Sequence, residues 1–153
     1  MTPTLEMLAR EQQELPLPRF DYEIAWQLGS AMREEAAAQA LPVAITIAHG
    51  TELVMSVLMP GATPDNLSWA ARKRAVAHRF HRSSLAIRLE AEKGGYDLNA
   101  VFALPAGDYV ASGGAVPLML QGGTLIGTAA VSGLPDVEDH AMVVRALRRV
   151  IAA

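Results

Sequence analysis

The sequence contains no cysteine and no apolar run long enough to cross a bilayer. Without cysteine there is no disulfide framework, no thiolate nucleophile and no Cys-ligated zinc, which fits a reducing compartment. The first twenty residues carry three glutamates and have no continuous apolar core, so they resemble neither a secretory signal nor a membrane span. We therefore expect a soluble cytoplasmic protein.

An excess of positive charge is also missing, because 13 lysines and arginines stand against 16 aspartates and glutamates. The formal net charge of -3 gives no general attraction to nucleic acid or to anionic lipid. The local basic run RKRAVAHRFHR, residues 72–82, spreads its charges around a helix, which favours a solvated or subunit-contact surface. We expect neither nucleic acid nor a membrane as a partner.

Recognisable catalytic and nucleotide-binding motifs are absent as well. No glycine-rich loop joins a parallel strand to a helix, and no serine lies in a G-x-S-x-G elbow. His78 and His81 have no third ligand beside them, so they predict no metal site. The residues leave open whether the protein catalyses a reaction.

What the sequence has in quantity is apolar residues, at 51%, with only 19% charged residues among its 153. This composition predicts one globular domain with a large core. Residues 1–20 combine a short helical pattern with the extended segment LPLP, and we expect them to form an arm on the domain or on a neighbouring subunit. Residues 21–153 form the single domain.

Periodicity within this domain changes between helical and alternating stretches. Val43, Ile45 and Ile47 alternate with smaller residues and predict the first strand of a hairpin. The expected elements in order are a helix at 22–40, a hairpin at 43–59, helices at 64–80 and 83–94, a loop at 96–114, a hairpin at 115–132 and a helix after residue 133. Two consecutive hairpins among helices predict an α+β sandwich around an antiparallel sheet.

The stretch VSGLPDVEDHAM, residues 131–142, gathers Asp136, Glu138, Asp139 and His140. Acids at the start of a helix and arginines at its end stabilise the helix dipole without any function. At 100° per residue His140 lies on the apolar stripe, whereas Glu138 and Asp139 point elsewhere. The pattern favours a helix start over a catalytic or metal site, and we expect His140 to face the sheet.

Lys73 is unusual because it falls inside the apolar stripe of the helix at 64–80, one turn from Trp69 and from Val76. A lysine at such a position either extends its ammonium to solvent or faces an anion in a pocket. Arg72 flanks Lys73 on the same side, while Arg74 faces away. Both readings of Lys73 stay open.

Three glycines stand beside or within the second hairpin, namely Gly113, Gly114 and Gly127. A glycine in a strand leaves room for a close backbone or a ligand, but it also marks ordinary bulges. These positions are therefore candidates for a ligand contact.

The C-terminal third, GGAVPLMLQGGTLIGTAAVSGLPDVEDHAMVVRAL at residues 113–147, resembles the signature of the haem-degrading-domain family. That family includes a haem-binding sensor-accessory protein and the C-terminal domain of a corrinoid adenosyltransferase. A whole-chain subgroup is similar also at RF before the first long helix, at LPVAI and PGATPDN, and at the tryptophan and RKR of the middle helix.

The resemblance implies a three-layer α/β/α sandwich, profilin-like or PAS-like, around a five-stranded antiparallel sheet. It also implies homo-oligomers, commonly dimers assembled into rings or octamers. In the broader family a lysine precedes an aromatic residue by seven positions, as Lys73 precedes Phe80 here, but Arg74 replaces the usual small residue. No haem-ligating residue can be matched, so the resemblance assigns no catalytic role.

Three functional hypotheses follow. The first is an oligomeric binding protein for a small anionic ligand, with haem or another tetrapyrrole as a candidate. Its site residues would be Lys73, Trp69, Arg72, Gly113, Gly114, Gly127 and His140. The second is a structural or adaptor oligomer without a small ligand. The third is a cofactor-dependent enzyme that uses Lys73, Asp139 or His140.

Overall fold

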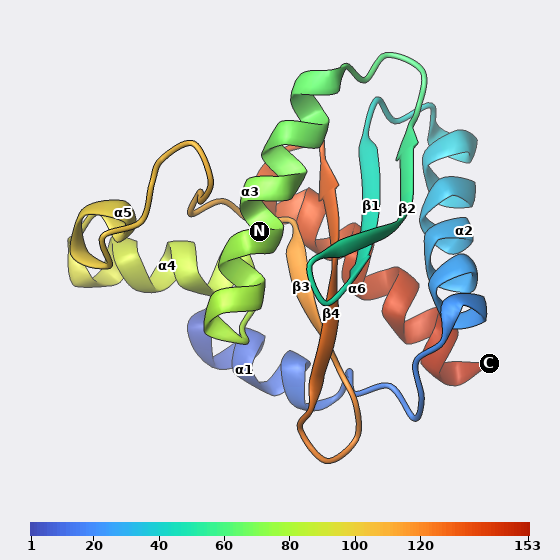
Figure 1. The fold of residues 1–153 in the computed structure, drawn as a ribbon, viewed down its shortest axis with the longest axis horizontal. Coiled ribbons are helices and arrows are strands. Elements are labelled where there is room, and N and C mark those ends of the chain that lie inside the picture. The colour runs from blue at the N-terminus through green and yellow to red at the C-terminus, as the bar shows by residue number, and fades with distance from the viewer.

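The computed structural model describes residues 1–153 and contains a four-stranded antiparallel sheet in the order β2-β1-β4-β3 (Figure 1). Its strands are β1 (Ala44–His49), β2 (Glu52–Leu58), β3 (Ala115–Met119) and β4 (Leu125–Ser132). Both predicted hairpins are present, and β1 pairs with β4 at the centre of the sheet. The α+β class is therefore confirmed.

Six helices surround this sheet, namely α1 (Leu5–Gln13), α2 (Tyr22–Gln39), α3 (Pro64–Phe80), α4 (Ser84–Gly94), α5 (Leu98–Val101) and α6 (Asp136–Ala152). Helices α2 and α6 pack together on one face of the sheet, and α3 covers β1, β4 and β3 on the other face. Helix α4 extends from the side of β3 and contacts α1, while α5 lies at its far end (Figure 1). None of these helices has the length and apolar character needed to cross a membrane.

Local signals in the sequence explain where the longer helices begin and end. The side chains of Asp21 and Ser83 accept hydrogen bonds from backbone amides in the first turns of α2 and α4. At α3, Thr63 and Asn66 form a capping box, and Pro64 occupies the first turn. Helix α3 ends where His81 adopts a left-handed conformation.

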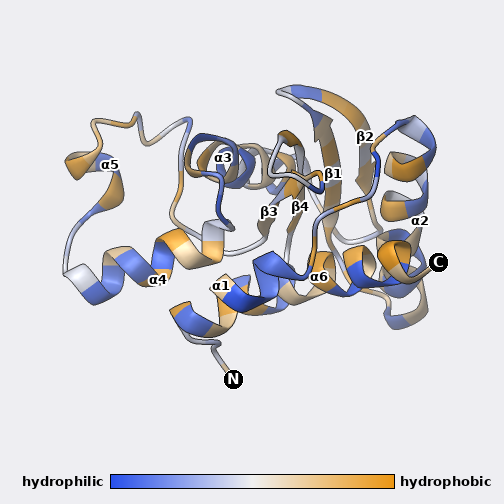
Figure 2. Ribbon diagram, turned by 90° about the horizontal axis from the view of Figure 1, so that it is seen from below, coloured by the Kyte–Doolittle hydropathy of each residue, from blue (hydrophilic) through white to orange (hydrophobic).

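The two faces of the sheet differ in the size of their side chains. Val43 before β1, together with Ile45 and Ile47 within it, belongs to the large core cluster under α2 and α6, as the alternation predicted. The α3 face carries small residues instead, namely Ala44, Thr46 and Ala48 on β1 and Thr128, Ala130 and Ser132 on β4. Figure 2 shows apolar strands between the helical layers. The main core therefore lies on the α2 and α6 side.

The N-terminal arm is built into this core. Leu15 and Leu17 are buried members of the main cluster, and the backbone of Leu17 forms an isolated parallel bridge with Leu120. The sheet has four strands where the family resemblance implied five, and this bridge is its one further pairing. A domain boundary after residue 20 stays a prediction.

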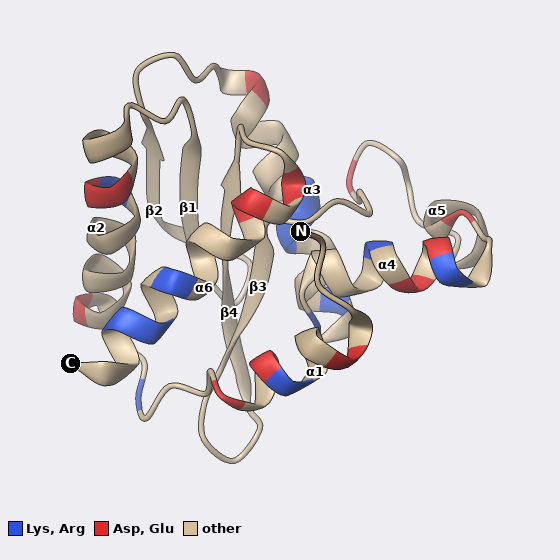
Figure 3. Cartoon of the chain, turned by 180° about the vertical axis from the view of Figure 1, so that it is seen from behind, with Lys and Arg blue, Asp and Glu red and all other residues tan.

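Figure 3 shows acidic residues at the start of α6 and basic residues further along it. Arg145 Nε lies 2.7 Å from Glu35 Oε1, and Arg149 Nη2 lies 2.8 Å from Glu34 Oε2, so two ion pairs join α6 to α2. The hydrogen bond from Arg145 lowers the pKa of the Glu35 carboxyl against the opposing effect of its partial burial. The arginines predicted to stabilise the end of α6 thus also link two helices.

Candidate functional site

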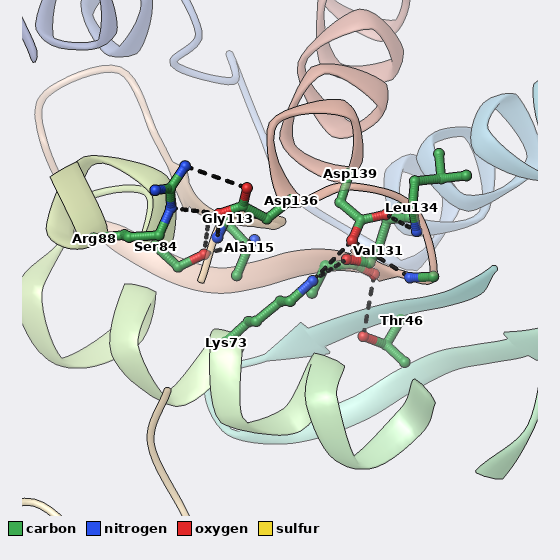
Figure 4. A network of polar contacts seen from close by, with 12 residues as sticks. Thr46, Lys73, Ser84, Arg88, Gly113, Ala115, Val131, Leu134, Asp136 and Asp139 are labelled. Atoms are coloured by element: carbon green, nitrogen blue, oxygen red, sulfur yellow. Dashed lines mark hydrogen bonds and ion pairs between the residues drawn. The ribbon is translucent and has the colours of Figure 1, made fainter. Parts of the chain in front are cut away.

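Lys73 is buried, with 2% of its surface exposed, although it lies on α3, which is an outer layer of the fold. Its ammonium reaches the end of β4, where Nζ donates to Asp139 Oδ2 at 2.9 Å and to the carbonyl of Val131 at 3.2 Å (Figure 4). Lys73 therefore neither extends to solvent nor meets an external anion. Its anionic partner is a carboxylate of the same chain.

Asp139 is the other half of this pair and is 1% exposed. It also accepts backbone hydrogen bonds from Leu134 at 3.0 Å and from Gly133 at 3.4 Å. Burial raises the pKa of the Asp139 carboxyl, and Lys73 acts in the opposite direction. The prediction that Asp139 points away from the apolar side of its helix is wrong. Helix α6 is buried on its sheet side and also on the side that meets the Gly133–Leu134 turn, and Asp139 is bonded to that turn.

Gly114 makes the Lys73–Asp139 ion pair possible. Its φ of +135° suits glycine, and a Cβ there would stand 2.8 Å from Lys73 Nζ. At Gly113 a Cβ would stand 2.7 Å from the Asp136 carbonyl oxygen. Both glycines therefore admit close approach, but the approaching groups belong to this chain.

The Lys73–Asp139 pair forms the floor of an open hollow of about 280 Å³ between the N-terminal ends of α3 and α6. Trp69 lines this hollow, and the Arg72 guanidinium stacks 4.3 Å from the centre of the Trp69 ring. Other residues lining it are Asp65, Asn66, Ser112, Ser132 and Asp136. Acidic groups outnumber the one lysine here, so the hollow is a poor receptor for an anion.

Gly127 and His140 lie apart from this hollow. A Cβ at Gly127 would collide with the backbone of Ala48 on β1, so this glycine permits close strand pairing. His140 Nε2 lies 2.7 Å from Glu11 Oε1 in α1, and no group of three potential metal-ligating side chains gathers around it. His140 was expected to face the sheet, but the polar contact of its ring is with Glu11 on α1.

A second cavity lies between the C-terminal half of α3 and the small-residue face of the sheet. It has a volume of about 330 Å³. We call it the Arg74 pocket, and its lining residues are Ala48, Gly50, Thr51, Ala71, Arg74, Ala75, His78, Arg79, Tyr109 and Thr128. It exists because alanines on α3 stand opposite an alanine and a threonine on β1 and β4, so no large side chain fills the interval.

Arg74 is the central charged group of this pocket. Its Nη1 donates to the Thr46 hydroxyl at 2.5 Å, and it forms no ion pair with any carboxylate. Burial lowers the pKa of the Arg74 guanidinium from its ordinary value. An arginine partly removed from water without a counter-ion is a group that an incoming anion would stabilise.

Two more groups that can carry positive charge line the Arg74 pocket, and no acid does. The Arg79 guanidinium lies 6.0 Å from the centre of the Tyr109 ring. His78 has a buried Nδ1 atom without a hydrogen-bond partner. The sequence analysis named Lys73 as the candidate ligand-binding residue of α3. In the structure its neighbour Arg74, on another side of the helix, lines this pocket.

Two patterns in the sequence, one on β1 and one on α3, together indicate where this pocket forms. The small residues alternating along β1 were visible, and so were alanines at positions 71 and 75, one turn apart on α3. Their meeting across the interface depends on the tertiary arrangement, which periodicity alone does not give.

Comparison with known proteins agrees with this architecture. The family model described as "Haem degrading protein HbpS-like" matches residues 20–148. The chain belongs to the HbpS-like family. A UPF0303 protein of Streptomyces avermitilis is 39% identical over 147 residues, which cover 96% of this chain and 90% of that protein.

Solved structures extend the likeness to three dimensions. The Ybr137w protein superposes with a TM-score of 0.90 at 27% identity, covering 99% of this chain and 90% of that one. The structure of a PduOC:heme complex superposes with a TM-score of 0.73 at 22% identity, covering 84% of this chain and 93% of that one. At this identity the PduOC likeness establishes the shared fold.

Proposed function

We propose that the protein is an oligomeric binding protein for a small anionic ligand and that the ligand binds in the Arg74 pocket. The observation that carries this proposal is Arg74 itself, a partly buried guanidinium with no carboxylate partner beside an open cavity. Pockets of this kind, with small apolar walls and a few convergent polar groups, are typical ligand sites.

Haem or another tetrapyrrole is the first ligand to test. Membership of the HbpS-like family supports it, and a relative of the same fold was crystallised as a haem complex. The carboxylates of haem suit the planar guanidinium of Arg74, which can donate two parallel hydrogen bonds to the two oxygens of one carboxylate.

The hollow above Lys73 is the second candidate site for such a ligand, with Trp69, Arg72 and Gly114 at its edge. We favour the Arg74 pocket, because the Lys73 ammonium already has two internal acceptors. A cofactor-dependent enzyme would need Lys73, Asp139 and His140 at one cavity. The first two meet in the hollow, whereas His140 is paired with Glu11 on α1.

The test is a titration of haemin into the purified protein, followed by its absorption spectrum. We expect a saturable shift of the Soret band in the wild type. The shift should weaken by about tenfold or more in Arg74→Ala, which removes a charge-assisted hydrogen-bond donor. Arg33→Ala, at an exposed arginine of α2, is the matched control and should bind as the wild type does.

Each outcome separates the candidates. Equal binding by wild type and Arg74→Ala, with loss of binding in a folded Trp69→Ala variant, would move the site to the Lys73 hollow. No binding of haemin or of any smaller organic anion would favour the adaptor hypothesis and would overturn the proposed function.

A further inference from the structure

We infer that the natural occupant of the Arg74 pocket is a planar aromatic carboxylate of one or two rings, whose carboxylate binds Arg74. This inference rests on the proposed function and narrows its ligand class. It follows from the kind of positive group present, from the orientation of α3, and from the size and chemistry of the pocket walls.

The positive group at the base of the pocket is a guanidinium with a fixed orientation. Its bond to the Thr46 hydroxyl ties one nitrogen of Arg74 to the middle of β1 and leaves the other donors unassigned. A planar fork held in this way matches the two oxygens of a carboxylate better than a single point charge would. The anchor therefore selects a flat anionic head.

The orientation of α3 disfavours a phosphate dianion. The helical residues that line the pocket run from Ala71 to Arg79, close to the C-terminal end of α3 at Phe80. A helix C-terminus carries partial negative charge, and phosphate sites are typically built at helix N-termini instead. No helix start lines this pocket, so a singly charged carboxylate is the better match.

The walls accept a flat apolar body. Ala48 forms part of the floor, Ala71 and Ala75 form the α3 side, and the Tyr109 ring stands at the same pocket as Arg79. An aromatic ligand can pack against these methyl groups and against the Tyr109 ring. The volume of about 330 Å³ is near the lower end of the range for small-molecule sites, roughly 300 to 1,000 Å³. A ligand of one or two rings therefore fits within the pocket, whereas a tetrapyrrole bound through Arg74 would extend beyond its open side.

The experiment compares four probes by calorimetry or ligand-observed NMR on the full chain. These are benzoate and 2-naphthoate as aromatic carboxylates, phenyl phosphate as the phosphate counterpart, and benzamide as the uncharged counterpart of benzoate. We expect the carboxylates to bind at least about tenfold more tightly than phenyl phosphate or benzamide, as the loss of one good charge-assisted contact implies.

Two variants test the geometry. Arg74→Lys keeps the charge but loses the planar fork, so it should weaken benzoate binding by about tenfold. Ala75→Leu fills the apolar wall and should abolish 2-naphthoate binding, provided that its circular dichroism matches the wild type. Arg33→Lys is the control for an arginine exchange outside the pocket and should leave binding unchanged.

The results distinguish this inference from the proposed function. Tight binding of phenyl phosphate, or equal binding of benzoate to wild type and Arg74→Lys, would overturn the aromatic-carboxylate assignment. If haemin binds through Arg74 while neither aromatic carboxylate does, the ligand class is wrong and the proposed function stands. If no anion binds, both fail.

Discussion

At the scale of single residues, two adjacent basic side chains of α3 have opposite situations. Lys73 is fully enclosed and has Asp139 as its counter-ion, whereas Arg74 is partly enclosed and has none. A helix turns by 100° per residue, which is enough to send neighbours to opposite sides of the same interface. Burial alone therefore does not identify a binding group, and the partner of each charge decides its role.

The first residue-scale prediction concerns the cost of breaking the buried pair. Lys73→Ala leaves the Asp139 carboxylate enclosed without its cation, so we expect the free energy of unfolding to fall by about 3–5 kcal/mol. The neighbouring Arg72→Ala loses only a contact with the Trp69 ring, worth about 1 kcal/mol or less. Urea unfolding of both variants measures the difference, and equal losses would contradict a structural role for the pair.

The second residue-scale prediction concerns pH. Burial raises the pKa of the Asp139 carboxyl above its unfolded value near 3.8, against the effect of Lys73, so the native chain keeps a proton that the unfolded chain has lost. The resulting stabilisation is present below the unfolded pKa and is lost as pH rises through the native pKa. The stability of the wild type relative to Asp139→Asn, which cannot titrate, should therefore fall as pH rises above 3.8.

Unfolding of the wild type and of Asp139→Asn, measured by denaturant at a series of pH values, tests this expectation. A stability difference that rises with pH over the same window would mean that Lys73 outweighs burial at Asp139.

At the scale of elements, the N-terminal arm and the helices are held in place by contacts between residues that are far apart in the sequence. The arm supplies Leu17 to the core, and Glu11 in α1 pairs with His140 in α6. Helix α6 in turn receives Lys73 from α3 through Asp139. The Lys73–Asp139 contact joins the two helical layers beside Val131 at the end of β4, whereas Leu17 attaches the arm beside Leu120, at the opposite end of β3.

The element-scale prediction tests whether the arm is an integral part of the fold. Leu17 has 0% exposure, so Leu17→Ala should lower the free energy of unfolding by about 2–5 kcal/mol through lost burial and a cavity. Met7, in α1 of the same arm, is 49% exposed, and Met7→Ala should change stability by about 0.5 kcal/mol or less. Wild-type stability in Leu17→Ala would show that the arm is detachable from the domain.

Local patterns predicted most of these elements. Alternation identified the first hairpin, and the expected helices at 22–40 and 64–80 agree with α2 and α3 to within one residue. The same patterns missed the burial of Asp139, because its partner comes from a helix on the opposite face of the sheet. They also missed the Arg74 pocket, since a cavity is a property of several small residues that meet only in the folded chain.

At the scale of the whole molecule, the helical layers do not cover the sheet evenly. Strand β2 is an edge strand, and α3 packs on β1, β4 and β3 instead. Leu53 and Leu58, whose partners Ala48 and Ala44 face α3, are left 51% and 40% exposed. An uncovered apolar strip along an edge strand is typical of an interface, and it supports the expectation of a homo-oligomer.

The whole-molecule prediction is that copies of the chain associate through this β2 strip, defined by Leu53 and Leu58. We expect sedimentation of the wild type to give an oligomer. Leu53→Lys should shift it towards smaller species, because the new charge would have to be buried without a partner. Val101→Lys is the matched control, since Val101 is 59% exposed on α5, away from β2, and should leave the oligomer intact. A wild-type monomer would contradict the predicted association, and an oligomer that Leu53→Lys leaves unchanged would place the interface elsewhere.

Because the Arg74 pocket also includes Gly50 and Thr51, from the turn between β1 and β2, an interface on this strip would lie beside the pocket. Oligomer dissociation in Leu53→Lys should then weaken haemin binding as well, whereas Val101→Lys should leave both properties unchanged.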